Sequence, residues 1–223
     1  MDTVKPKILY EDNHILVAIK PPNLPSQADE SGDMDMLSLC REHLRTSRGK
    51  PGQAYIGLVH RLDRPAGGLM AFACTSKAAT RLSAQFAEKS AGREYLAVVR
   101  GKIPEGTHIH WLADRNGMVR AVPEGTKAAK RAELAIEILQ EKDDLTLVRV
   151  TLKTGRKHQI RAQCAALGHP LWGDQRYAFG LSKPGEQLAL WGYRLQLVHP
   201  TMGEAMEWEQ NPEGGVWGKF EIC

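Results

Sequence analysis

The sequence predicts a mixed fold of the α/β (α+β) class in which strands outnumber helices. Apolar segments bounded by turn residues recur along the chain, as is typical of strands, and the clearest span 8–20, 133–152 and 188–198. Helical spacing is confined to segments near 36–44, 75–89 and 159–167. The apolar fraction of 42% over 223 residues is ordinary for a globular protein and suits one large domain or two small ones.

Charge and cysteine content narrow the function classes. A net charge of +4 is compatible with a nucleic-acid partner without requiring one. The cysteines are far apart and form no C-x-x-C pair, which excludes a zinc ribbon and a disulfide framework, and we expect free thiols: Cys40, Cys74, Cys164 and Cys223. The N-terminal segment carries charged residues where a signal peptide has an apolar core, and no apolar run reaches the length of a membrane span. We therefore expect a soluble, cytoplasmic protein.

The first predicted elements are two strands within 8–20, joined by a polar turn and ended by Pro21-Pro22. A helix follows over 36–44, with a basic end formed by Arg41, Arg45, Arg48 and Lys50. Cations are favourable near a helix C-terminus, so this end is interpreted as a solvated face, and the alternative is one edge of an RNA groove.

The next predicted unit is a strand over 69–74 and a helix that begins at Thr75 or Ser76 and runs to about 89. Ala79, Leu82 and Phe86 fall on one face of this helix, which is the pattern of a helix packed on a sheet. A strand over 92–101 comes next.

Residues 103–130 are irregular and mixed in charge. His108 and His110 would face the same way in a strand, but no third ligand is near, and we expect no metal there. A hairpin is predicted from strands over 133–139 and 145–152, then a helix that ends near Gly168 with Ile160, Cys164 and Leu167 inward. Strands over 188–198 and 206–209 complete the chain.

The segment 57–70 is the strongest candidate for a reactive loop. An apolar run leads to Asp63, which lies between Arg61 and Arg64, and a proline and two glycines follow before an apolar run resumes. The neighbouring guanidinium groups favour an ionised Asp63. A surface ion-pair cluster is the simpler alternative. A protein-kinase catalytic loop is excluded, because there the Asp directly follows the Arg.

A second cluster lies at 152–161, where four Lys and Arg side chains surround the start of the last predicted helix. Free backbone N–H groups at a helix start also attract anions. Repulsion among the cations destabilises the segment unless a phosphate backbone or a carboxylate such as Asp63 offsets it.

These segments together resemble the RluA-type RNA pseudouridine synthases. His60-Arg61-Leu62-Asp63 is similar to motif II of that family, Lys20-Pro21-Pro22 to motif I, and Tyr95-Leu96-Ala97 to its Tyr-x-Ala motif. The Thr-Gly-Arg-x-His-Gln-Ile-Arg and Gly-x-Pro-x-x-Gly-Asp-x-x-Tyr motifs resemble 154–161 and 168–177. One departure is Ala66-Gly67-Gly68, where many members have Thr-Ser-Gly.

The resemblance implies roles for individual residues. Asp63 would be the catalytic residue, with Arg61 beside it, and Tyr95 would stack on the target base. Arg161 would pair with Asp63. Arg156 and Lys157 would contact RNA phosphates, and the cationic segment within 103–130 would be a hairpin insert that grips RNA.

The resemblance also implies the fold and the reaction. We expect a mixed, mostly antiparallel sheet in two halves with flanking helices and a central catalytic cleft, in a single catalytic domain over 1–223 without the N-terminal S4 domain that some members carry. The expected activity is isomerisation of uridine to pseudouridine in ribosomal or transfer RNA by a monomer, without a cofactor or a metal.

Two questions stay open from the sequence. Asp63 either attacks the ribose or removes a sugar proton. A non-catalytic RNA-binding protein on the same scaffold and a hydrolase that releases uracil are the alternative functions.

Overall fold

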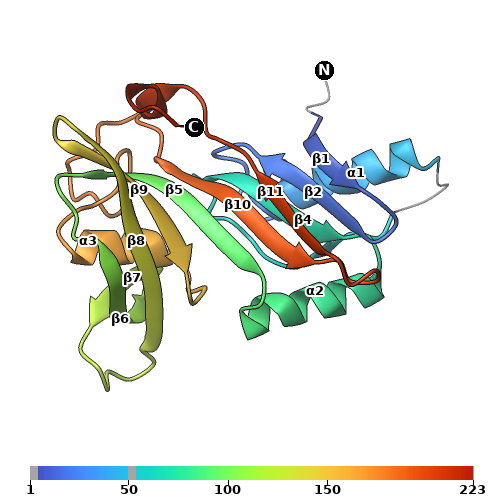
Figure 1. Cartoon of the computed structure of the whole chain (residues 1–223), viewed down its shortest axis with the longest axis horizontal. Helices are drawn as coiled ribbons and strands as arrows, with labels where there is room; N and C mark the ends of the chain where they lie inside the picture. The colour runs from blue at the N-terminus through green and yellow to red at the C-terminus, as the bar shows by residue number, and fades with distance from the viewer. Residues whose placement is uncertain (1–4, 50–53, 223) are drawn as a thin grey trace. The chain divides into compact units, whose positions relative to one another are not determined.

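The computed structural model describes residues 5–49 and 54–222 (Figure 1). The chain divides into two compact units, and each unit combines segments that are distant in the sequence. Unit 1 consists of residues 1–92 and 192–210, and unit 2 of residues 93–191 and 211–223.

Unit 1 is a sheet with two accompanying α-helices. Its strands follow the order β1 (Lys7–Glu11), β2 (Ile15–Lys20), β4 (Gly67–Ala73) and β10 (Leu190–Val198, of which Gly192 onward belongs to this unit). Strand β3 (Gly57–Leu58) pairs with β4, and β11 (Ala205–Glu209) pairs with β10. The pairings of β1 with β2, β2 with β4, β3 with β4 and β10 with β11 are antiparallel.

Every residue of β2 and β4 is buried, which places these strands at the centre of the unit 1 core. Helix α1 (Met36–Ser47) begins after Asp35, whose side chain accepts the Ser38 N–H at 3.0 Å. Helix α2 (Ser76–Glu88) begins after Thr75, whose hydroxyl accepts the Ala78 N–H at 3.1 Å. Such N-caps satisfy backbone donors that no helix bond can reach. Helix α2 packs against β3 and β4 and buries Ala78 and Leu82 (Figure 1).

The start of β4 needs glycine. Gly68 has a φ of +123°, and a Cβ added there would lie 2.3 Å from the backbone nitrogen of Gly192 in β10. Only glycine lets two backbones approach so closely in this conformation. Gly68 therefore serves packing against β10.

Replacement of Gly68 by Ala is expected to destabilise the protein by about 2 kcal/mol, because the new methyl group forces two backbones apart. Gly106→Ala is the matched control, since Gly106 has a similar φ of +111° but open space around it. Urea denaturation of both variants measures the difference, and equal losses of stability would show that the close approach contributes nothing.

Unit 2 is a sheet of antiparallel strands with one short α-helix. Its strands follow the order β5 (Gly92–Arg100), β9 (Leu145–Leu152), β8 (Lys130–Lys142), β6 (Gly106–Arg115) and β7 (Met118–Val122). Helix α3 (Gln159–Ala166) packs against β6 and β7 (Figure 1), and a 3₁₀ helix spans Gly215–Lys219. The core beneath α3 is formed by Leu112, Val119, Ala132, Ala162 and Tyr177.

The structure confirms the predicted class, with mostly antiparallel strands and few helices. The predicted strands and helices occur within a few residues of their expected bounds. The expectation that 103–130 is irregular is wrong, because β6 and β7 form a hairpin there with a turn at Asn116-Gly117. The charged residues of this hairpin are exposed, and they masked the alternation that reveals a strand.

Helix α3 also differs from the expected amphipathic helix. Six consecutive residues from Gln159 to Cys164 are buried, whereas Leu167 is only half-buried. Polar side chains of α3 are therefore inside unit 2, where each needs a partner.

Cys40, Cys74 and Cys164 are buried free thiols, and Cys223 lies outside the described residues. Burial raises the pKa of Cys40 to about 12 and that of Cys74 to about 11, so both thiols stay protonated and unreactive. In the described part of the chain, no helix is long and apolar enough to cross a membrane.

Candidate active site

The loop that carries Asp63 connects β3 to β4. Asp63 is half-buried between the buried Leu62 and the exposed Arg64. The Ala66 N–H donates to the Asp63 carbonyl oxygen at 3.0 Å, which closes a tight turn just before β4. The carboxylate is thus carried by a turn between two strands of unit 1.

The last residue of β2 and the segment after it fix this turn on both sides of Asp63. Ser26 Oγ donates to the Leu62 carbonyl at 2.8 Å and accepts the Leu62 N–H at 3.1 Å. Lys20 Nζ donates to the Arg64 carbonyl at 3.0 Å. Because the residues before and after Asp63 are both held, the backbone at Asp63 is positioned by more than its own loop.

The Arg64 guanidinium is held by an acidic loop. It contacts Asp29 at 3.5 Å, donates to Ser31 Oγ at 3.0 Å and pairs with Asp33. The hydrogen bond from Arg64 lowers the pKa of Asp33. Arg64 therefore anchors this acidic loop, Arg61 is exposed, and the effect of the two guanidinium groups on Asp63 stays a prediction.

Lys20 is a residue of this site that the sequence did not reveal. Its side chain is completely buried, and its charge interacts with Asp63. The signal was a lysine at the end of an otherwise apolar strand, directly before two prolines.

In unit 2, the buried Arg161 is held by Asp174. Arg161 Nε donates to Asp174 Oδ2 at 2.8 Å and Nη2 donates to Oδ1 at 2.8 Å, in a bidentate pair. The guanidinium also lies over the ring of Tyr177, 5.0 Å from its centroid. Asp174 was part of a quoted motif but was not predicted as a site residue.

The loop around Asp174 explains this pair. Asp174 Oδ1 also accepts the N–H groups of Arg176 and Tyr177, each at 3.0 Å. Tyr177 OH accepts the Val119 N–H at 3.1 Å and lies 2.9 Å from His158 Nδ1. The two motifs that are separate in the sequence are thus joined into one hydrogen-bonded network beside α3.

The other predicted residues of unit 2 have separate environments. Tyr95 is buried in β5, opposite Val150 of β9. Lys157 pairs with Asp114 at 2.8 Å, and Arg156 Nε donates to the Arg131 carbonyl at 3.1 Å. Lys157 and Arg156 are both exposed. The carboxylates of Asp114 and Asp174 therefore offset part of the cationic cluster that the sequence predicted.

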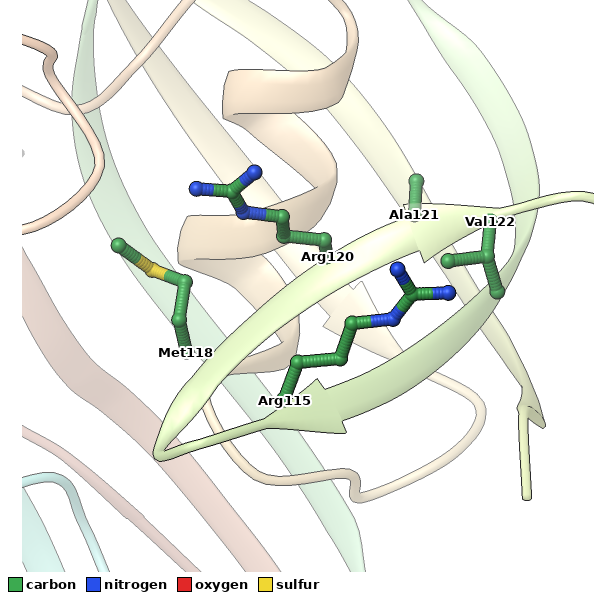
Figure 2. Close-up of a pocket in the computed structure, with 5 residues that line it drawn as sticks. All are labelled: Arg115, Met118, Arg120, Ala121 and Val122. Carbon is green, nitrogen blue, oxygen red and sulfur yellow. The ribbon is translucent and has the colours of Figure 1, made fainter. Parts of the chain in front are cut away.

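A pocket of about 320 Å³ lies on the hairpin β6–β7 (Figure 2). It is lined by Arg115, Met118, Arg120, Ala121 and Val122. Figure 2 shows Arg115 extended along the hairpin towards Val122, while Arg120 points away from it. Both arginines are exposed, and neither has a hydrogen bond or ion pair within residues 5–49 and 54–222. This hairpin therefore offers two available cations beside an apolar lining.

His108 and His110, the histidine pair that the sequence analysis considered for a metal, are held by internal contacts. His110 Nδ1 lies 3.0 Å from the Gln163 amide nitrogen, and His108 Nε2 lies 2.9 Å from the Pro104 carbonyl. No group of metal-ligating side chains occurs among the residues that the structure describes.

At the basic end of α1, Arg45 pairs with Glu42 and Arg48 with Glu11. Lys50 lies outside the described residues. Arg45 and Arg48 therefore have internal partners, and the alternative that this helix end forms one edge of an RNA groove stays a prediction.

Comparisons with known proteins agree with these motifs. Residues 14–166 match the family model described as RNA pseudouridylate synthase. The chain is 35% identical to the ribosomal large subunit pseudouridine synthase D of Pseudomonas aeruginosa, over 95% of this chain and 70% of that protein. It is 32% identical to the ribosomal large subunit pseudouridine synthase C of Vibrio cholerae, over 90% of this chain and 64% of that protein.

A solved structure shares the fold. The structure of human RNA Pseudouridylate Synthase Domain Containing 4 superimposes with a TM-score of 0.78 at 20% identity, and covers 92% of this chain and 88% of that chain.

Proposed function

We propose that the chain, which belongs to the RNA pseudouridylate synthase family and is an isomerase acting on RNA, converts specific uridines of ribosomal or transfer RNA into pseudouridine. In this proposal Asp63 is the catalytic residue. The names of the two relatives refer to the large ribosomal subunit, which makes ribosomal RNA the first substrate to test. Transfer RNA is the second, because the sequence motifs are common to both kinds of enzyme.

The observation that supports Asp63 most is the fixation of its loop. Ser26 holds Leu62 by two hydrogen bonds, and Lys20 holds Arg64 by a third. A loop of a purely structural ion-pair cluster does not need its backbone held on both sides of one carboxylate. A reacting carboxylate needs such fixation, because a small displacement from the reactive geometry lowers the rate by a large factor.

The chemistry fits one carboxylate. The bond between ribose C1′ and uracil N1 breaks, the uracil turns, and a bond from C1′ to C5 forms, while the C5 proton is lost and N1 gains a proton. Both bonds lie within one nucleotide, so no oxidant, reductant or group donor is required. Asp63 starts the reaction either by attack at the ribose or by removal of a sugar proton.

The other predicted residues have roles around the flipped uridine. Unstacking the uridine costs a few kcal/mol, and Tyr95 supplies a stacking face that offsets part of this cost. Arg61 fills the vacated space or holds the flipped phosphate. Arg161, which the family resemblance pairs with Asp63, is held by Asp174, and its pairing with Asp63 stays a prediction. Arg156 and Lys157 contact the RNA backbone. In this proposal a single catalytic domain works as a cytoplasmic monomer, without metal or cofactor.

The test is incubation of the protein with unmodified transcripts of large-subunit ribosomal RNA and of transfer RNA, without added cofactor. Pseudouridine content, its position and free uracil are measured. We expect pseudouridine at one or a few positions and no free uracil. Free uracil would instead indicate a hydrolase, and binding to every transcript without any product would indicate a non-catalytic RNA-binding protein.

The exposed arginines of the β6–β7 hairpin give a prediction on binding. Arg120→Gln is expected to weaken RNA affinity severalfold at 0.1 M salt and to reduce the slope of log affinity against log salt by about 1, because one phosphate contact is lost. Arg115→Gln is expected to act similarly. Arg45→Gln is the control, since Arg45 pairs with Glu42. An unchanged salt slope in both hairpin variants would remove this hairpin from the RNA interface.

A further inference from the structure

The loop at 174–187, between α3 and β10, exposes two large apolar side chains. It lies in unit 2. Phe179 is 71% exposed, more than any other large hydrophobic side chain that the structure describes, and Leu181 is 58% exposed. Scattered exposed apolar residues are normal, whereas apolar side chains that are grouped mark sites of interaction. The loop therefore presents apolar surface that the fold leaves uncovered.

Phe179 also has a backbone conformation that is unfavourable for its residue type. Its φ is +46°, in the left-handed region, where the Cβ of a side chain crowds the following carbonyl oxygen. Strained residues of this kind persist where the surrounding structure holds them, and they cluster at sites that bind ligands. The conformation of Phe179 thus adds a second observation, independent of its exposure, that indicates binding.

Hydrogen bonds hold the loop on both sides of Phe179. The Leu181 N–H donates to the Ala178 carbonyl at 2.9 Å, which closes a turn around the phenylalanine. Gln175 Nε2 donates to the Lys183 carbonyl at 2.7 Å and so joins the two arms of the loop. The ring of Phe179 is therefore carried by an ordered backbone, which lowers the entropy lost on binding.

The charge that the loop leaves unpaired is positive. Arg176 and Lys183 are exposed, and neither forms an ion pair with a residue that the structure describes. The acidic residues of the loop are paired with arginines of unit 2: Asp174 with Arg161 and Glu186 with Arg100. A partner that meets this loop therefore gains by carrying negative charge.

Arg176 also joins the loop to the β6–β7 hairpin. Its Nη1 donates to the carbonyl of Gly117, in the turn of that hairpin, at 3.1 Å. The hairpin carries Arg115 and Arg120, the exposed cations that line the pocket (Figure 2). The apolar side chains of the loop are thus accompanied by cations from two neighbouring segments of unit 2.

We propose that Phe179 is a stacking platform for an unpaired base of the RNA, other than the target uridine, and that Arg176 and Lys183 bind the adjoining phosphates. An aromatic ring among arginine and lysine side chains is the combination by which proteins hold single strands, because every base has a π face and every nucleotide a phosphate. A duplex offers phosphates but keeps its bases stacked on one another. A protein partner is disfavoured, because a stable interface covers about 800 Å² on each side, far more than two side chains provide.

This inference deepens the proposed function and rests on it, because it takes the RNA substrate as the partner. It makes unpaired nucleotides outside the target position part of what the protein recognises. The sequence predicted RNA contacts only for cations and for Tyr95, so an aromatic contact in this loop is an additional determinant of substrate choice.

The experiment compares the affinities of the full chain for a short oligouridine and for an RNA duplex of the same length, and measures the melting temperature. Phe179→Gly is expected to weaken oligouridine binding about tenfold, the effect of one lost stacking contact, and duplex binding by less than about twofold. Its melting temperature should stay close to that of the wild type, since glycine relieves the strained φ and the lost ring is mostly exposed. Phe179→Trp keeps an aromatic face and is expected to retain the affinity for oligouridine.

Two further variants separate stacking from charge and from general apolar contact. Lys183→Gln is expected to weaken the binding of both RNAs by similar factors, because it removes a phosphate contact. Met202→Ala, at an exposed apolar position of unit 1, is expected to leave both affinities unchanged. If Phe179→Gly does not fold, Phe179→Asn takes its place, since asparagine also tolerates a positive φ.

Several results would overturn the role of Phe179. Unchanged oligouridine binding in the glycine variant, or an equal loss for oligouridine and duplex, would show that the ring does not stack on a base. A melting temperature that falls together with the affinity would assign the ring to packing. Loss of self-association in sedimentation, with RNA affinity unchanged, would assign the loop to an interface between copies of the chain.

The pseudouridine assay tests the proposed function separately. A chain that binds oligouridine through Phe179 but forms no pseudouridine on any transcript keeps the stacking role and loses the catalytic function. A chain that forms pseudouridine while Phe179→Gly binds both RNAs as the wild type does keeps the catalytic function and loses the stacking role.

Discussion

Replacement of Asp63 by Asn is expected to lower the rate of pseudouridine formation by at least about a thousandfold, because an amide can neither attack the ribose nor remove a proton from it. Asn has nearly the same shape, and the hydrogen bonds from Ser26 and Lys20 go to the backbone of the neighbouring residues Leu62 and Arg64. The melting temperature and RNA affinity should therefore stay close to those of the wild type. Single-turnover assays on ribosomal and transfer RNA transcripts measure the loss.

Asp33→Asn is the matched control for this experiment. Asp33 lies beside the same loop and pairs with Arg64 on the exposed side, so its removal changes the local charge by the same amount. Its activity should remain within a few fold of wild type, since exposed ion pairs contribute at most about 1 kcal/mol. Equal losses in the two variants would mean that charge near the loop, and not the Asp63 carboxylate itself, determines the rate.

Asp174→Asn is expected to destabilise the protein by about 3 kcal/mol, because it removes a carboxylate charge from a buried ion pair. The side chains of Arg161 and Asp174 are only 6% and 0% exposed, and two hydrogen bonds of 2.8 Å join them. The Asn oxygen can still accept the backbone N–H groups of Arg176 and Tyr177, so the loss reports mainly on the charge. Urea denaturation measures the change in the free energy of unfolding. An unaltered m value shows that the variant exposes the same surface on unfolding as the wild type.

Asp114→Asn provides the comparison, because Asp114 pairs with Lys157 at the same distance of 2.8 Å but both side chains are more than 40% exposed. Its effect on stability should be below about 1 kcal/mol. If Asp174→Asn destabilises the protein no more than Asp114→Asn does, burial does not make the Arg161–Asp174 ion pair more important for stability than the exposed one.

The local features of this fold could be predicted from the sequence. Thr75 as a helix cap and the hairpin of β8 and β9 depend on neighbouring residues, whose patterns are visible in the chain. The residue pattern did not show the β6–β7 hairpin, because exposed arginines obscure its alternation, and only the family resemblance implied a hairpin there. Helix α3 was expected to have one apolar face, yet it buries polar side chains on several sides, and no local pattern indicates that.

The features of the candidate site also differ in whether the sequence alone predicts them. Asp63 became a candidate from its setting among arginine, proline and glycine, and the family motif implied its role. Its support by Ser26 and Lys20 depends on residues about forty positions away, which only the folded chain brings together. The pairing of Arg161 with Asp174 could not be read from the sequence either. Both residues were visible in motifs, but the choice of partner depends on the loop that carries Asp174.

The close approach of Gly68 to Gly192 has a consequence for protein synthesis. Strand β4 is complete once residue 73 has emerged from the ribosome, but the backbone that lies against Gly68 belongs to β10, and unit 1 is complete only after residue 210. At 5–20 residues per second this delay is about ten seconds. During that time β4 is paired with β2 but lacks its other neighbour, β10, and an uncovered strand edge invites pairing with other chains. The turn after Asp63 thus acquires its final support only after β10 has been synthesised, and until then the uncovered edge of β4 needs protection from aggregation.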